Sequence, residues 1–318
     1  MQLPRQLSQR SVGIIAAVIT VLIWTSFIVV ARFSARLTLT SFDISFLRYI
    51  AAACVLIPIG IWLVKKRAAT DPSLPSWLGM SPMAFKTTAL VGSIAGVAYP
   101  LLAYSGFFFA PAAHASVLLP GSLPLWTTLI AFLILKTPIS AMRGVGLAMI
   151  FVGDLLVGGA SLLKAFSGGN VWVGDLLFLG ASCSWATYSV LTRKLALPAI
   201  NATVALTVFA AMTFVPVYAA LVLAGIVPSK LAQAPWSEII FQGLYQGIGS
   251  VVISGITFVK MIEIFGPVRS TMITAIVPIL SAISAVIFLN EPLGWNLLVG
   301  LVMVTVGIMF GVRPVVAR

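Results

Sequence analysis

The stretch Gly13–Arg32, which reads GIIAAVITVLIWTSFIVVAR, decides how this chain folds. It carries no charge before its last residue, and about 20 apolar residues in a helix cross the hydrocarbon core of a bilayer. The core of a secretory signal peptide is shorter and ends at a small-residue cleavage site. We therefore predict that this stretch is an uncleaved first transmembrane helix, spanning residues 13–32.

Nine further runs of this kind follow along the chain. With 60% hydrophobic and only 8% charged residues, the protein has too little polar surface for a water-soluble domain. Lipid offers backbone groups no partners, so helices are expected, and the runs are twice as long as barrel strands. The predicted fold is all-α and integral to the membrane, with ten transmembrane helices. The other nine cover residues 43–64, 85–109, 112–135, 142–160, 172–192, 202–225, 237–260, 267–289 and 294–312.

The basic residues predict the orientation. The net charge is +12, but Lys and Arg are scattered between apolar runs and form no face for nucleic acid. Basic residues favour cytoplasmic loops. With the N-terminus inside, 14 of the 19 lie on the cytoplasmic side and 5 on the other. We predict cytoplasmic termini, and a surface loop in the polar segment 65–81.

The second half of the sequence repeats the first, so we divide the chain into residues 1–163 and 164–318. Shifts of 161, 156 and 154 residues bring similar residues into register, as changes in loop length would do. The matched pairs are Gly13 with Gly174, Trp24 with Trp185, Arg32 with Arg193, Pro111 with Pro267, Pro124 with Pro278 and Gly153 with Gly307.

Five helices in each half have a topological consequence. Five is odd, so the second half enters the membrane from the opposite side and the repeat is inverted. Inverted repeats are typical of secondary transporters, which hold the solute near the midplane where the halves meet. We predict alternating access around a cavity lined by the first, third, fourth, sixth, eighth and ninth helices.

Several short motifs support this interpretation. They are Trp24–Arg32 (WTSFIVVAR), Phe46–Tyr49 (FLRY), Ala103–Gly106 (AYSG) and Leu289–Leu293 (LNEPL). In the order and spacing of these motifs, the chain resembles the drug/metabolite transporter superfamily, in particular its EamA-like ten-helix exporters. The resemblance implies efflux of small metabolites, such as amino acids or related amphipathic compounds, across the cell inner membrane. The chain departs from that pattern at 136–138, where Lys-Thr-Pro replaces the usual acidic residue.

Aromatic residues are the first candidates for substrate binding. Trp24 and Trp185 lie near the middle of their spans, where indole rings either wall a cavity or pack helices together. Tyr188 lies three residues after Trp185, on the same helix face. Tyr99 precedes a proline in the third span, and we include it in the predicted site.

Prolines and amides inside the spans are the second group. Pro124 and Pro278 free backbone carbonyls, so each either shapes and gates a cavity or makes a passive kink. Gln242 and Gln246 share one face of the eighth span and must point inward. We select Gln246 as a substrate contact, with hydrogen bonding between helices as the alternative.

Three ionisable residues complete the set. His114, the only histidine, either couples transport to protons or has a structural role. Asp154 lies deep in the fifth span, where it either carries protons or contacts a second copy of the protein. Arg48 is expected to anchor the end of a span.

Motifs for catalysis and metal binding are missing from the sequence. It contains no P-loop, HExxH or GxSxG pattern, and Cys54 and Cys183 have no metal-binding spacing. We therefore expect no catalytic residue, metal or cofactor. The expected partners are a small-molecule substrate and the lipid bilayer, with protons or an exchanged solute as driving force; the oligomeric state is left open. An intramembrane enzyme and a non-transporting scaffold are the alternatives.

Overall fold

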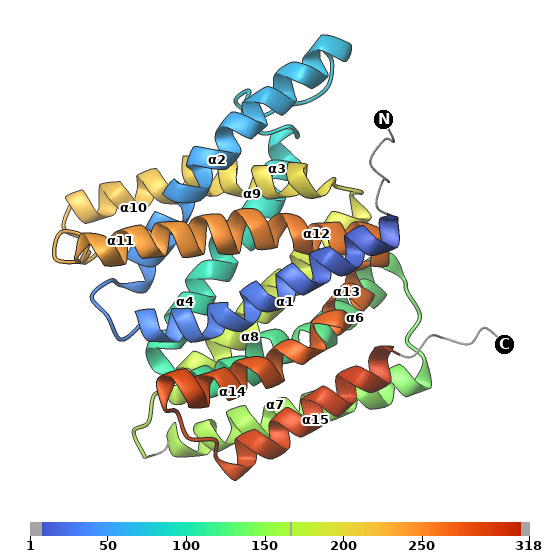
Figure 1. The fold of residues 1–318 in the computed structure, drawn as a ribbon, viewed down its shortest axis with the longest axis vertical. Coiled ribbons are helices and arrows are strands. Elements are labelled where there is room, and N and C mark those ends of the chain that lie inside the picture. Colours follow the sequence, from blue (N-terminus) through green and yellow to red (C-terminus); the bar gives the residue numbers. More distant parts are fainter. Residues whose placement is uncertain (1–7, 166, 313–318) are drawn as a thin grey trace, which may run out of the picture.

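The computed structural model describes residues 8–165 and 167–312, and within them every regular element is a helix (Figure 1). Ten helical segments follow one another. They are α1 (Gln9–Ser34); α2 (Ser41–Thr70); α3, η1 and α4 (Phe85–Val91, Gly92–Ala98, Tyr99–Phe109); α5, η2 and α6 (Ala112–Ser116, Val117–Gly121, Leu123–Leu135); α7 (Ala141–Ala165); α8 (Val171–Lys194); α9 and α10 (Ala199–Met212, Phe214–Leu223); α11, η3 and α12 (Trp236–Gln242, Gly243–Ile253, Ser254–Phe265); α13, η4 and α14 (Pro267–Ile273, Thr274–Ile276, Val277–Leu289); and α15 (Trp295–Val312).

Most of these segments are long and apolar enough to cross a bilayer. Eight of those described have 23 to 30 residues, and α15 is a shorter apolar helix. The tenth, α8, has 24 residues but is more polar. It packs against α4, α6 and α7, so protein rather than lipid surrounds much of it. The predicted all-α integral membrane fold is confirmed, and the ten helical segments lie where the ten spans were predicted.

The contacts between helices repeat: when each helix is replaced by its counterpart in the other half, the same pairs are in contact. Helix α1 packs on α12 and α14, and its counterpart α8 packs on α4 and α6. Helix α2 packs on η3, and its counterpart α9 packs on η1. The pairs α2 with α9 and α7 with α15 each join counterparts, and α7 and α15 lie side by side along one edge (Figure 1). This pattern is what a twofold pseudosymmetric arrangement of two five-helix halves produces.

Local details repeat as well. Lys136 ends α6 and Asn290 ends α14, both in the left-handed conformation, with φ values of 56° and 53°. Their backbone N–H groups donate to Ala131 and Ala285, which are also 154 residues apart. The third and eighth spans both contain a π-helix, η1 and η3. Such wide turns are rare and frequently mark functional sites.

The second span is longer than its apolar run predicts. It begins at a capping box between Thr40 and Asp43 and continues to Thr70. The prediction of a loop from Lys65 is therefore wrong for the first six residues of that segment. Lys, Arg and Ala are good helix formers, so the helix continues beyond the apolar part before the loop begins at Asp71.

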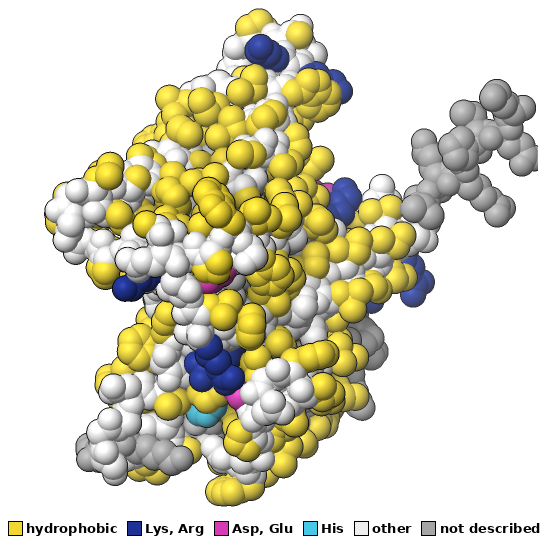
Figure 2. Space-filling view, turned by 60° about the vertical axis from the view of Figure 1, so that its left-hand side comes forward, with side chains coloured by type: hydrophobic (Ala, Val, Ile, Leu, Met, Phe, Trp, Pro, Cys, Tyr) yellow, Lys and Arg dark blue, Asp and Glu magenta, His cyan; other side chains and the backbone are white. Residues whose placement is uncertain are grey.

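The outer surface suits a lipid environment. Many large hydrophobic side chains are exposed, among them Leu133, Phe288 and Val302. The face in Figure 2 is largely hydrophobic, and a small group of basic, acidic and histidine side chains lies in its lower half.

Candidate functional site

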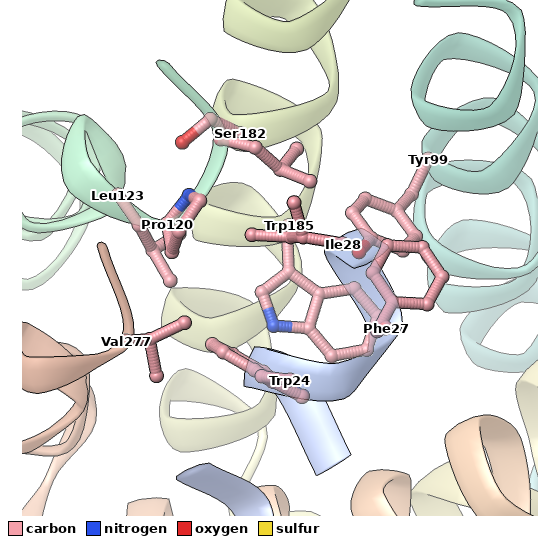
Figure 3. Close-up of a pocket in the computed structure, with 10 residues that line it drawn as sticks. Trp24, Phe27, Ile28, Tyr99, Pro120, Leu123, Ser182, Trp185 and Val277 are labelled. Carbon is pink, nitrogen blue, oxygen red and sulfur yellow. The ribbon is translucent and has the colours of Figure 1, made fainter. Parts of the chain in front are cut away.

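A small cavity lies where the two hydrophobic cores of the protein meet. Trp24 and Tyr99 pack against both cores. The cavity has a volume of about 30 Å³, and Figure 3 shows its side chains converging on the Trp185 indole. They come from both halves: Trp24, Phe27, Ile28, Tyr99, Leu119, Pro120, Leu123, Ser182, Trp185 and Val277.

Trp24 and Trp185, counterparts in the repeat, touch each other across the junction. Their ring centroids lie 6.1 Å apart in an edge-to-face arrangement. Tyr99 packs on Trp185 at 4.7 Å, and Tyr188 packs on it at 5.2 Å. Unlike the other three aromatic residues, Tyr188 does not line the cavity. It is fully buried and packs behind Trp185.

Broken helices form the side of the cavity that faces α1 and α8. The fourth span changes to the π-helix η2, which contains Pro120, and α6 resumes with Pro124 in its first turn. The ninth span contains the 3₁₀ turn η4, and α14 begins with Pro278 in its first turn. A Cβ placed on Gly121 would lie 3.7 Å from the Pro278 ring, so the two breaks are adjacent. The proline positions thus lie directly beside the cavity.

Two residues that line this cavity, and Tyr188 behind it, have buried polar atoms without partners among the described residues. Among the described residues, the Ser182 hydroxyl, the Trp185 indole nitrogen and the Tyr188 hydroxyl are buried without a hydrogen bond. Buried polar groups are nearly always paired, so each such atom needs an explanation. A bound solute or water would satisfy those that face the cavity.

Gln246 belongs to a polar group beside the cavity. Its amide oxygen accepts a hydrogen bond from the Tyr104 hydroxyl at 2.8 Å, and its amide nitrogen has no partner among the described residues. Arg48 donates to the same hydroxyl at 2.8 Å. Arg48 is only 3% exposed, so the expectation that it anchors the end of a span is wrong. Its place near the start of α2 suggested exposure, but α4 and η3 pack against that helix.

His114 does not line the cavity. Its Nδ1 lies 2.8 Å from a carboxylate oxygen of Asp175, and the Ser161 hydroxyl donates to the other oxygen of that carboxylate. The contact ties α5 to α8. Asp154 also lies away from the centre, in a lateral cavity of about 230 Å³ between α6, α7 and α8. It is buried, and neither carboxylate oxygen has a partner among the described residues.

An ion-pair cluster joins the halves at one end. Glu291, just after α14, accepts from Arg32 at 2.9 Å and from Arg36 at 2.7 Å. Arg32 also donates to the Phe107 carbonyl at 2.6 Å. Its repeat counterpart Arg193 bonds only to a backbone carbonyl, that of Glu263, among the described residues. The arginines at these two equivalent positions therefore differ in their partners.

Sequence reasoning missed part of this site. Phe27 and Ser182 line the cavity one helical turn from Trp24 and Trp185, and that spacing was an available signal. Pro120 also lines the cavity, whereas the proline predicted from the repeat is Pro124. Within the described residues, no group of His, Cys, Asp and Glu could hold a metal ion.

The comparisons with known proteins agree with this architecture. The family model described as EamA-like transporter family matches residues 11–159 and 172–313. An uncharacterized transporter of Archaeoglobus fulgidus is 26% identical over 182 residues. The match covers 56% of this chain and 56% of that protein, so the chain spans about half the length of this curated relative.

A solved crystal structure shares the fold. It superimposes with a TM-score of 0.58 at 19% identity, over 94% of this chain and 95% of the other. At that identity the likeness concerns the fold alone. The family match covers most of both halves, and the chain therefore belongs to the EamA-like transporter family.

Proposed function

We propose that this membrane transporter is a secondary carrier, without enzymatic activity, that moves small amphipathic molecules by alternating access. One observation carries the proposal. The repeat counterparts Trp24 and Trp185 meet in a cavity that is lined by both halves. Indole walls bind apolar bodies, and a few polar atoms between them orient the solute.

The size of the cavity supports a mechanism with conformational change. A single water needs about 10–15 Å³ of such space, so a cavity of about 30 Å³ holds only two or three waters. A metabolite enters only after the surrounding helices separate. In the pseudosymmetric packing, α1 with α12 and α14 and α8 with α4 and α6 form equivalent contacts, which makes opening toward either side similar in kind.

The unpaired donors in the cavity favour solutes with both polar and apolar parts, such as amino acids or related metabolites. We propose export across the cell inner membrane, with both termini in the cytoplasm, in line with the family resemblance and the distribution of basic residues. A gradient of the solute, exchange or protons would drive transport.

Flux into proteoliposomes tests this function. We expect uptake of amphipathic amino acids to saturate with concentration and to show counterflow. Trp185→Ala removes the central wall and should lower uptake by about tenfold or more, because the solute loses its largest apolar contact. Trp295→Ala is the matched control, since Trp295 is 74% exposed on α15. Uptake that rises linearly with concentration, or equal effects of the two variants, would refute the carrier.

A further inference from the structure

A positive charge is buried in the first half without a negative partner in the described part of the chain. Arg48 lies in α2 and is 3% exposed. Its guanidinium carbon lies 5.8 Å from the ring centroids of both Tyr49 and Tyr104. An arginine remains protonated inside a protein, and a buried charge is costly unless it is paired.

None of the seven acidic side chains of the chain provides that pairing. All seven lie in the described residues, and none forms an ion pair within 4.0 Å of Arg48. Asp154 lies in the lateral cavity without a partner. The other six bond to other groups: Asp43, Asp71, Asp175, Glu238, Glu263 and Glu291.

The groups around Arg48 are rich in unused donors. One guanidinium nitrogen donates to the Tyr104 hydroxyl at 2.8 Å and to the Ser250 hydroxyl at 3.2 Å. The Tyr104 hydroxyl donates in turn to Gln246, so its own proton is already used. The Arg48 Nε and the Gln246 amide nitrogen are buried and have no acceptor within residues 8–165 and 167–312. The described residues thus give this cluster one positive charge and two buried donors without a protein acceptor.

This cluster lies next to the aromatic cavity. Tyr104, which accepts a hydrogen bond from Arg48, packs on the cavity-lining residue Phe27, with ring centroids 5.8 Å apart. A Cβ on Gly247 would lie 2.9 Å from the Arg48 carbonyl oxygen, so glycine lets η3 approach α2 closely here. Both halves thus enclose the guanidinium beside the cavity.

We propose that Arg48 binds the carboxylate of the transported solute, whose apolar body lies between Trp24 and Trp185. The inference rests on the proposed function and specifies its substrate class as aromatic or similarly bulky organic carboxylates. A planar guanidinium fork matches a carboxylate in charge and geometry. A single buried cation balances one negative charge, which favours a carboxylate over a doubly charged phosphate.

Three matched probes test the inference on the full-length protein in nanodiscs: phenylpropionate, phenylalanine and phenethylamine. We expect the wild type to bind at least one of the two carboxylates, phenylpropionate or phenylalanine, with an affinity at least about tenfold higher than that for phenethylamine, which has no carboxylate. Equal affinity for phenylalanine and phenylpropionate would show that the carboxylate suffices. Preference for phenylalanine would add an ammonium contact, and both outcomes support Arg48 as the anion site.

Variants locate the effect. Arg48→Gln should reduce carboxylate binding to the level of the amine, and Arg48→Lys should retain part of it because the charge remains. Arg10→Gln, at an exposed arginine near the start of α1, is the matched control and should bind like the wild type. The probe comparison in the wild type keeps the test valid even if a variant fails to fold.

Two outcomes would overturn the inference: tight binding of phenethylamine, or unchanged carboxylate binding by folded Arg48→Gln. Failure of all three probes to bind would also refute the aromatic carboxylate class. The carrier function fails separately, by absence of saturable counterflow. A protein that transports amines with counterflow would keep the proposed function and lose only the role of Arg48.

Discussion

The cavity at the centre and the α7–α15 pair at the edge are packed in opposite ways. Around the cavity, large rings meet at angles and leave space, with the Ser182 and Trp185 polar atoms unpaired. Between α7 and α15, the backbones approach so closely that a Cβ on Gly153 would lie 2.8 Å from the Gly300 carbonyl oxygen. A Cβ on Gly307 would lie 2.5 Å from the Gly146 oxygen.

The difference in packing suggests different roles for the two regions. Small residues at membrane helix interfaces allow close backbone contact, and dispersion over that area stabilises association. A junction with space and unmet hydrogen bonds is less tightly held, and it has groups left for a solute. We therefore propose that the α7–α15 edge is the scaffold and that the centre binds the solute.

The largest expected effect is on the edge. Gly153→Leu forces a side chain against the Gly300 carbonyl and Val304, and we expect destabilisation by about 3 kcal/mol, at the upper end of typical overpacking costs. Thermal unfolding in detergent measures it. Gly158→Ala is the control on the same helix, because a Cβ there meets nothing within 4 Å. A Gly153→Leu protein as stable as this control would mean that the edge is loosely packed.

At the centre, a smaller chemical change should affect transport but not folding. Trp185→Phe keeps an aromatic ring and removes the unpaired indole N–H, so uptake should fall by about tenfold while the melting temperature stays within error. Trp126→Phe is matched, since the Trp126 indole N–H is also unpaired but faces the lateral cavity. Equal uptake by the two variants would remove the distinction between centre and edge.

The ion-pair cluster should show an intermediate effect on stability. Glu291→Gln leaves Arg32 and Arg36 without their shared carboxylate, and we expect a loss of about 1–2 kcal/mol for this partly buried cluster. The double variant Arg32→Gln with Glu291→Gln should recover part of that loss, because one unpaired charge is also removed. Additive losses in thermal unfolding would show that the two side chains do not interact.

The smallest effect is expected at Asp154. Its carboxylate has no partner among the described residues, so Asp154→Asn removes no ion pair. The melting temperature should stay unchanged, and the uptake rate should stay within about twofold of the wild type. Uptake measured over a range of pH is the check. A strong loss of uptake would extend the transport machinery to the lateral cavity and weaken the division proposed here.

The sequence predicted the spans well because hydropathy is a property of the chain itself. The predicted limits 85–109, 112–135 and 267–289 coincide with the helical segments observed. Pro111 lies between two predicted spans and Pro267 begins another, which agrees with the tendency of proline to end a preceding helix. The internal repeat alone placed Trp24 and Trp185 at equivalent positions in the two halves.

The π-helices, the burial of Arg48 and the partner of His114 could not be predicted, because they depend on contacts between segments far apart in the sequence. The π-helices η1 and η3 arise where two helices from different halves pack closely, at Gly96 against Leu206 and at Gly247 against Arg48. The burial of Arg48 likewise depends on α4 and η3, far along the chain. His114 was selected for its chemistry alone, and its partner Asp175 could be known only from the fold.

Sided labelling of a cysteine introduced in the cavity tests the central claim most directly. Ser182→Cys is made after Cys54 and Cys183 are replaced by Ala. Arg32→Cys with Glu291→Cys then allows a bifunctional thiol reagent to lock that end of the protein.

A thiol-reactive probe is added from one side of proteoliposomes, and labelling at position 182 is followed over time. Alternating access predicts that the lock blocks labelling from its own side and accelerates labelling from the opposite side. Labelling from the opposite side at an unchanged rate, or no labelling from either side, would contradict it.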